Sequence, residues 1–235
     1  MPYYLGFDPT YILVLIGAVI CLIASARVKT TFNRYSQYRS MTGMTGAQAA
    51  ERILRASGIG DVTIQHVSGN LTDHYNPSQK TLNLSDSVYN ATSVAAIGVA
   101  AHECGHAIQH QQGYVPLSFR TAIVPFANIG SSLAWPLILI GLFFTRDTGY
   151  VFIHLGILCF SLAVLFQLVT LPVEFNASRR ALQILGDQGI LADSELPYTR
   201  KVLKAAALTY VAGAAASILQ LLRLILLFGG RGRDD

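Results

Sequence analysis

The chain has 235 residues, of which 52% are hydrophobic and 13% are charged, whereas charged residues make up about 25% of an ordinary soluble domain. This composition excludes a disordered, collagen-like or coiled-coil protein, because each of these needs a polar or strictly repeating sequence. The three cysteines lie far apart, so the chain has neither a disulfide framework nor a CxxC metal site. The composition therefore predicts a membrane protein.

Four apolar runs are candidates for membrane spans. A helix that crosses a hydrocarbon core of about 30 Å needs about 20 residues, so three runs qualify and the first is near the lower limit. No Lys or Arg precedes the first run and several follow it directly, which is typical of a retained anchor rather than a cleaved signal peptide. The predicted spans are residues 11–26, 122–144, 150–173 and 205–228.

The basic residues predict the orientation of these spans. Four spans place segments 27–121 and 174–204 on the same side, and these segments hold eight and five of the 17 Lys and Arg residues. The positive-inside rule puts both segments in the cytoplasm and both termini outside, with lipids around the spans. The formal net charge of +4 therefore reflects topology, and no nucleic-acid partner is expected.

Segment 27–121 is long enough to fold outside the bilayer. A helix is predicted from Thr45 or Gly46 to Gly58, and alternating residues predict short strands near 62–66, 71–75 and 81–85. Ser93 then caps a long helix over residues 94–111. These elements predict a small α+β unit.

The long helix contains the sequence His102-Glu103-Cys104-Gly105-His106, which is an HExxH motif. Histidines four residues apart lie on one helical face, so both imidazoles can bind the same zinc ion. The carboxylate of Glu103 can then lie beside a metal-bound water and act as general base. The motif predicts a zinc hydrolase site on this helix.

A catalytic zinc needs a third protein ligand and one open position. The metzincin extension is absent, because Gln109 and Gln112 stand where it requires Gly and His. His110 lies about 12 Å along the helix from the first ligand and is expected to be an exposed helix-end residue, whereas His66 is expected to be structural. Glu174 is the best candidate, because it follows the third span directly on the side of the motif.

The glutamates leave one alternative open. Glu174 could instead form a simple salt bridge with Arg179 or Arg180. Glu51 and Glu195 lie in amphipathic contexts and are expected to be solvated.

The order of these features resembles the gluzincin membrane proteases, including the HtpX-type heat-shock proteases and the CAAX prenyl proteases. The chain is more closely similar to the YugP-type membrane zinc metallopeptidases, and this resemblance extends over nearly the whole chain. It rests on an Arg/Asp-rich tail and on four stretches, namely LTDHYNP (71–77), KTLNLSDSVY (80–89), AHECGHAIQ (101–109) and PVEFNAS (172–178).

The resemblance implies that His102, His106 and Glu174 bind one zinc ion and that Glu103 is the catalytic base. It implies a multi-pass α-helical membrane protein with four transmembrane helices and a small cytoplasmic α+β zincin-like metalloprotease unit, together forming one domain over residues 1–235.

The chain departs from the gluzincin ExxAD pattern, because Ser178 replaces the Asp. The partner that orients a ligating histidine is therefore either Asn176 or Ser178.

Two further hypotheses concern substrate contacts. Strand 81–85 is either an edge strand to which a peptide adds beside the metal, or an ordinary interior strand. His74 and Tyr75 lie in a polar turn, where either one could stabilise the tetrahedral oxyanion or have a structural role.

Three functions are consistent with the sequence. The first is a zinc endopeptidase that acts at the cytoplasmic membrane face on peptides or membrane proteins. The second is an intramembrane protease, but the apolar part of the motif helix, residues 94–108, is shorter than a span. The third is a non-enzymatic membrane scaffold with a structural or vestigial zinc site.

Overall fold

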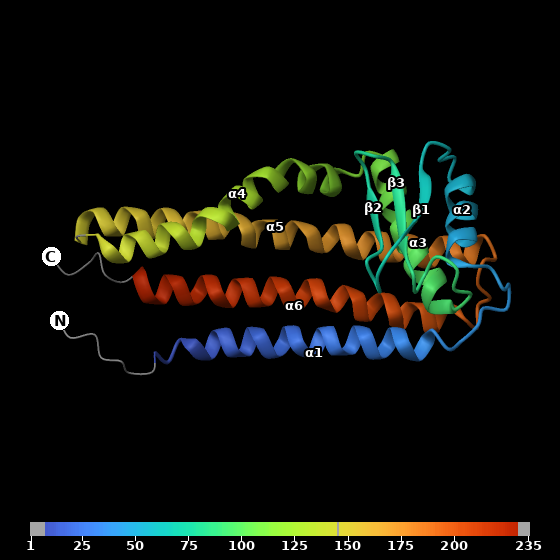
Figure 1. The fold of residues 1–235 in the computed structure, drawn as a ribbon, viewed down its shortest axis with the longest axis horizontal. Coiled ribbons are helices and arrows are strands. Elements are labelled where there is room, and N and C mark those ends of the chain that lie inside the picture. Colours follow the sequence, from blue (N-terminus) through green and yellow to red (C-terminus); the bar gives the residue numbers. More distant parts are fainter. Residues whose placement is uncertain (1–7, 145, 230–235) are drawn as a thin grey trace. The chain divides into compact units, whose positions relative to one another are not determined.

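The computed structural model describes residues 8–144 and 146–229, with residues 146 and 147 described by their backbone alone. The external positions predicted for the first residues, for the Arg146 side chain and for the Arg/Asp-rich tail lie outside this description. The elements in chain order are α1 (Tyr11–Tyr35), α2 (Gly46–Ala56), β1 (Thr63–Val67), β2 (His74–Asn76), β3 (Thr81–Ser85), α3 (Val94–Gln111), α4 (Val115–Phe143), α5 (Arg146–Asp187) and α6 (Leu196–Phe228) (Figure 1).

The chain divides into two compact units. The first contains the described residues 8–23, 119–144, 146–170 and 210–229, and the second contains residues 24–118 and 171–209. The second unit nearly coincides with the two predicted cytoplasmic segments. Helices α1, α4, α5 and α6 contribute residues to both units.

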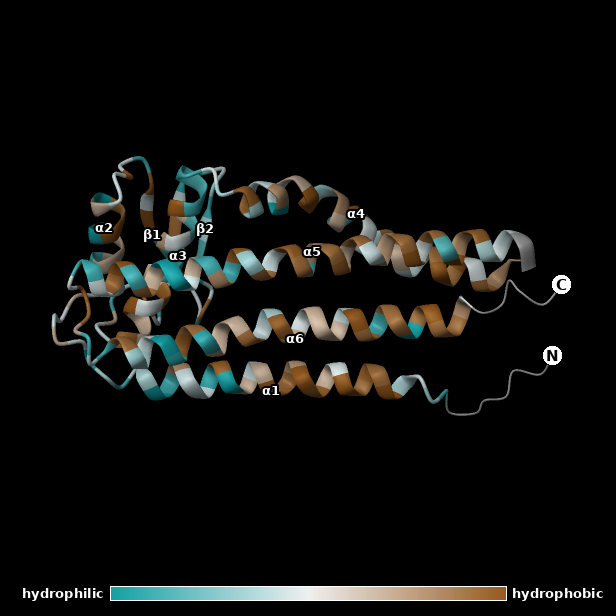
Figure 2. Ribbon diagram, turned by 180° about the vertical axis from the view of Figure 1, so that it is seen from behind, coloured by the Kyte–Doolittle hydropathy of each residue, from teal (hydrophilic) through white to brown (hydrophobic). Residues whose placement is uncertain are grey.

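In the described residues, four helices are long and apolar enough to cross a membrane, which confirms the predicted number of spans. The candidate segments are Tyr11–Tyr35, Val115–Phe143, Thr148–Asp187 and Leu196–Phe228. Hydrophobic residues cover the parts of these helices that belong to the first unit (Figure 2). Helix α5 continues through Pro172 to Asp187, so the residues that follow the third predicted span are still helical.

Small residues bring α4 and α5 close together in the first unit. A Cβ atom at Gly130 would lie 2.6 Å from the carbonyl oxygen of Cys159, and one at Gly156 would lie 2.8 Å from that of Ala134. Such close approach of helix backbones is the usual packing mode of membrane helices.

Arg223, the charged residue within the last predicted span, has partners in the first unit. It donates a hydrogen bond to Asp8 at 3.2 Å, and its guanidinium lies 4.1 Å from the ring centre of Tyr11. The charge is therefore paired near the beginning of α1.

The second unit contains a three-stranded sheet in the order β1-β3-β2. Strand β3 pairs in parallel with β1 and antiparallel with β2, and all five of its residues are buried. The edge-strand hypothesis for residues 81–85 is therefore wrong, and β3 is the interior strand. The predicted strand at 71–75 is confined to β2, His74–Asn76.

The two helices beside this sheet begin where their caps predict. Thr45 forms a capping box with Gln48 at the start of α2, and the Ser93 hydroxyl accepts from the amide of Ala96 at the start of α3. Helix α2 buries Ala50 and Ile53 against the core that it shares with α3. These apolar contacts fix the position of the motif helix.

Helix α3 also packs closely against the second-unit parts of α5 and α6. A Cβ atom at Gly105 would lie 2.7 Å from the carbonyl oxygen of Ala177, which is fully buried. A Cβ atom at Gly98 would lie 2.5 Å from the Thr199 methyl group. Glycine at these positions therefore allows the helices to approach.

The environment of Glu195 differs from the prediction. Its side chain is 5% exposed and accepts hydrogen bonds from the backbone amides of Met41 and Ala192, both at 2.8 Å. The predicted solvated carboxylate is therefore a buried link between two loops. Glu51 is exposed as expected and pairs with Arg55.

Replacing Gly105 with Ala tests the contact between α3 and α5. The added methyl group would overlap the Ala177 carbonyl, so we expect the free energy of unfolding to fall by about 1–3 kcal/mol and zinc affinity to fall with it. Gly60→Ala is the matched control, because a Cβ atom at Gly60 would have no neighbour within 4 Å. Thermal unfolding and zinc titration measure both effects, and equal behaviour of the two variants would contradict this role of Gly105.

Candidate active site

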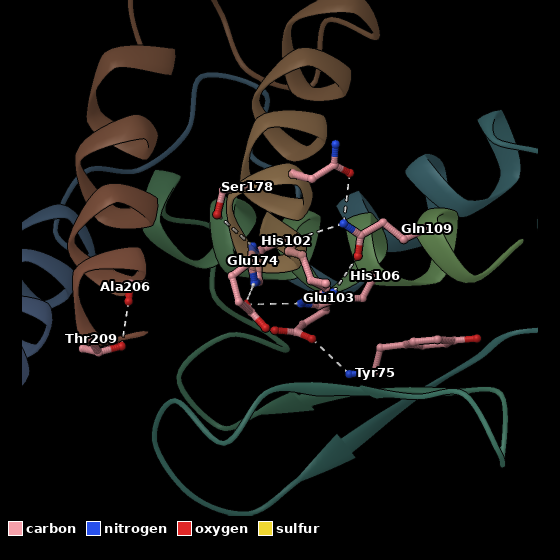
Figure 3. Close-up of polar contacts among 11 residues, drawn as sticks. Tyr75, His102, Glu103, His106, Gln109, Glu174, Ser178, Ala206 and Thr209 are labelled. Atoms are coloured by element: carbon pink, nitrogen blue, oxygen red, sulfur yellow. Dashed lines mark hydrogen bonds and ion pairs between the residues drawn. The ribbon is translucent and has the colours of Figure 1, made fainter. Parts of the chain in front are cut away.

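Helices α3 and α5 bring together His102, His106 and Glu174 (Figure 3). The Glu174 Oε2 atom lies 3.2 Å from His102 Nε2 and 3.5 Å from His106 Nε2. The three candidate ligand atoms all lie within 4.8 Å of one another. Residues that are far apart in the sequence thus form one compact group.

This group fits a zinc ion. Ligands about 2.0–2.2 Å from a tetrahedral zinc are separated from one another by about 3.3–3.6 Å, which is close to the two distances from Glu174 to the histidines. Two imidazoles and one carboxylate are also a known ligand set of catalytic zinc, in which the fourth position takes water or substrate. Glu174 is only 2% exposed, so its charge requires such partners.

Cys104, inside the motif, faces away from this group. Its Sγ atom lies 3.7 Å from the carbonyl oxygen of Ala50 on α2. Burial raises the pKa of the Cys104 thiol well above its usual value, whereas a metal ligand must be a thiolate. The candidate ligand atoms beside one another are therefore the nitrogen and oxygen atoms of His102, His106 and Glu174.

The electrostatic environment of His106 favours a charged ring in the metal-free protein. Burial alone would lower the pKa of His106, but the hydrogen bond to Glu174 and the charge of Glu103 raise it above its usual value. The carboxylates therefore create a strongly cation-attracting position beside His106.

Each histidine has a second polar contact on its Nδ1 atom. The Ser178 hydroxyl lies 3.1 Å from His102 Nδ1, and Gln109 Oε1 lies 3.0 Å from His106 Nδ1. Asn176 Oδ1 accepts a hydrogen bond from Gln109 Nε2 at 3.0 Å. Of the two partners expected from the sequence, Ser178 thus contacts His102 directly. Asn176 contacts Gln109, which in turn contacts His106.

Gln109 was not among the predicted site residues. Its position three residues after His106 places both side chains on one helical face, and this was the local signal that could have identified it. Its contact with Asn176, which is 67 positions away, depends on the tertiary fold.

Glu103 lies between the candidate metal-binding group, formed by His102, His106 and Glu174, and strand β2 (Figure 3). Its Oε2 atom accepts a hydrogen bond from the backbone amide of Tyr75 at 3.0 Å, and its side chain is mostly buried. The Tyr75 hydroxyl lies 2.9 Å from His110 Nδ1, and burial raises the pKa of Tyr75. Tyr75 therefore connects β2 with α3 at two points.

Both ring nitrogens of His74 have neighbours in the β2 region. Its Nδ1 atom lies 2.9 Å from the carbonyl oxygen of Thr72, and its Nε2 atom lies 3.2 Å from Asn83 Nδ2. These contacts are consistent with a structural role, although an oxyanion role stays a hypothesis.

The other expected positions are consistent with the structure. His66 contacts Asp86 at 2.7 Å, and His66 and His110 are both exposed and outside the metal-binding group. Arg180, an alternative partner of Glu174, donates to Asn176 and Gln112.

Comparisons with known proteins define the class of this chain. Residues 10–229 match the family described as "Putative neutral zinc metallopeptidase". The chain belongs to this family, so the resemblance to membrane zinc metallopeptidases is confirmed.

A particular relative is the protein named "Putative membrane protease YugP" from Bacillus subtilis (strain 168). The two sequences are 47% identical over 212 residues, which cover 90% of this chain and 92% of the relative. No solved structure matches the chain significantly.

The raised pKa of His106 predicts that pH has opposite effects on the stability of the metal-free and the zinc-bound protein. In the metal-free protein, the stabilisation by charged His106 is complete below the unfolded pKa of about 6.5 and is lost as pH rises through the raised folded pKa. Zinc must displace a proton, so its stabilising effect grows over the same range. Thermal unfolding from about pH 6 to about pH 9 measures both trends.

His106→Gln is the control for this prediction, because it removes the titrating ring. We expect the metal-free wild type to lose stability relative to this variant as pH rises. A constant difference between the two proteins across the pH range would contradict the prediction.

Proposed function

We propose that this protein is a zinc-dependent endopeptidase. His102, His106 and Glu174 bind one zinc ion, and Glu103 is the catalytic base. The observation that carries the proposal is the convergence of three ligand atoms within 4.8 Å, next to the carboxylate that follows the first histidine. Membership of a zinc metallopeptidase family supports it.

A bound zinc would polarise the scissile carbonyl and increase the acidity of the attacking water. Glu103 accepts a proton from this water as the water oxygen adds to the carbonyl carbon. It then delivers the proton to the amide nitrogen as the C–N bond breaks. The backbone amide of Tyr75 holds one oxygen of the base in place throughout.

The remaining candidate residues have supporting roles in this proposal. Ser178 orients His102 directly, and Asn176 acts on the second ligand through Gln109. His74 and Tyr75 stay the two candidates for stabilising the oxyanion. The backbone amide of Tyr75 already contacts the base, whereas its hydroxyl contacts His110.

We further propose that the site faces the cytoplasm and that residues 1–235 act as one domain. Glu174 directly follows the predicted span 150–173 on the continuous helix α5, so a substrate must come close to the membrane surface. Peptides or exposed segments of membrane proteins are therefore the expected substrates. The concentration of basic residues in segments 27–121 and 174–204 supports the orientation.

The other functions from the sequence are less well supported. Helix α3 is not among the candidate spans found in the described residues, which does not favour intramembrane proteolysis. A structural or vestigial zinc site in a membrane scaffold remains the alternative. It gives no reason for a buried Glu103 beside the ligands.

Glu103→Gln is the direct test of catalysis. The amide cannot accept the proton, so we expect peptide cleavage to fall by about 10²- to 10⁴-fold. Zinc content should stay at the wild-type value, because Glu103 is not a proposed ligand. Cleavage of a fluorogenic peptide library and metal analysis of the purified protein measure the two effects.

Glu51→Gln is the matched control, because Glu51 is exposed and pairs with Arg55. This variant should retain full activity. Unchanged cleavage by the Glu103 variant would contradict the enzymatic assignment and favour the scaffold.

Cysteine labelling tests the orientation. In a variant whose native cysteines are replaced by alanine, a single cysteine at Ser78, in the exposed turn between β2 and β3, should react with a membrane-impermeant maleimide only after cells are permeabilised. A cysteine at Thr148, between the predicted spans 122–144 and 150–173, should react in intact cells. The reverse pattern would contradict the proposed orientation.

A further inference from the structure

The side-chain amide of Gln109 is fully buried between α3 and α5. Its Nε2 atom donates to the carbonyl oxygen of Val173 at 2.9 Å and to Asn176 Oδ1 at 3.0 Å. Its Oε1 atom lies 3.0 Å from His106 Nδ1. The amide thus connects His106, one proposed zinc ligand, with helix α5, which carries Glu174, another proposed ligand.

The chemistry of the neighbours permits one orientation of this amide. The Val173 carbonyl can only accept a hydrogen bond. Arg180 Nε, which can only donate, contacts Asn176 at 2.7 Å, so the Asn176 atom at this position is its oxygen. A rotation of the Gln109 amide by 180° would place its oxygen against two buried acceptors, and the lost hydrogen bonds would be costly.

We propose that Gln109 is a positioning residue that fixes the tautomer in which His106 binds zinc. This inference rests on the proposed zinc site. The Gln109 oxygen faces His106 and can only accept, so the Nδ1 atom carries the hydrogen. The Nε2 atom, which faces Glu174 at 3.5 Å, is then the nitrogen whose lone pair would bind a zinc ion.

The two proposed histidine ligands differ in this respect. His102 Nδ1 contacts the Ser178 hydroxyl, which can either donate or accept. The hydroxyl therefore imposes no tautomer, whereas the amide of Gln109 does. A neutral amide takes the place that a carboxylate often occupies behind a zinc-bound histidine.

Gln109→Met tests the proposal, because methionine has a similar length but cannot accept the Nδ1 proton. Zinc affinity of the full chain in detergent is measured by competition with a chromogenic chelator. We expect a loss of about 10- to 100-fold, the usual effect of removing a group that orients a metal ligand. Gln111→Met, the same change at an exposed position of α3, should change affinity less than twofold.

A spectroscopic measurement tests the tautomer of His106 directly in the wild type. In the zinc-loaded protein with ¹⁵N-labelled histidine, His106 should show a hydrogen-bonded Nδ1 proton and a metal-bound Nε2 atom. The spectrum of His106→Gln identifies the signal. Gln109→Met should shift the proton signal and accelerate its exchange with water.

The outcomes separate this inference from the proposed function. Metal binding through His106 Nδ1, or wild-type zinc affinity in a folded Gln109→Met variant, would overturn the role of Gln109 and leave the zinc site intact. If the wild type itself binds no zinc, the proposed function fails.

Discussion

The pairing of one buried carboxylate constrains how α3 and α5 pack in the second unit. Glu174 is only 2% exposed, and an isolated charge at such a position would be strongly unfavourable. The contacts with His102 and His106 provide its compensation in the metal-free protein. These contacts require α3 and α5 to approach closely, which Gly105 permits by leaving space for the backbone at Ala177. The same short distances that pair the carboxylate also define a position for a zinc ion.

Helix α5 has three roles at this site. It provides Glu174, it provides the Ser178 hydroxyl beside one histidine, and it provides the backbone and side-chain oxygens that hold Gln109 behind the other. A shift of α5 along α3 would therefore disturb a ligand and its supports at the same time. Because α5 is one continuous helix from Arg146 to Asp187, the predicted span 150–173 and Glu174 lie on the same helix.

Local signals in the sequence predicted the elements of the site better than their tertiary contacts. The HExxH spacing lies within one helix, and the apolar runs have lengths set by the bilayer, so both follow from short segments. Glu174 is the proposed third ligand because it follows the third predicted span on the side of the motif, and the structure brings it beside the two histidines. Gln109 was missed because its partners Val173 and Asn176 come from another helix. Glu195 was placed in solvent because its amphipathic context does not reveal the loop amides of Met41 and Ala192 that it binds. Strand 81–85 was left open between edge and interior, because the alternation of residues gives no information about strand order.

X-ray absorption spectroscopy of the zinc-loaded protein tests the central claim most directly, namely that two histidines and Glu174 hold one zinc ion. We expect one zinc per chain, surrounded by nitrogen and oxygen atoms at about 2.0–2.2 Å with scattering from two imidazole rings. Glu174→Ala should remove one oxygen ligand and weaken binding. A sulfur neighbour at about 2.3 Å, which would implicate Cys104, or a zinc environment that does not change in the Glu174 variant, would contradict the account.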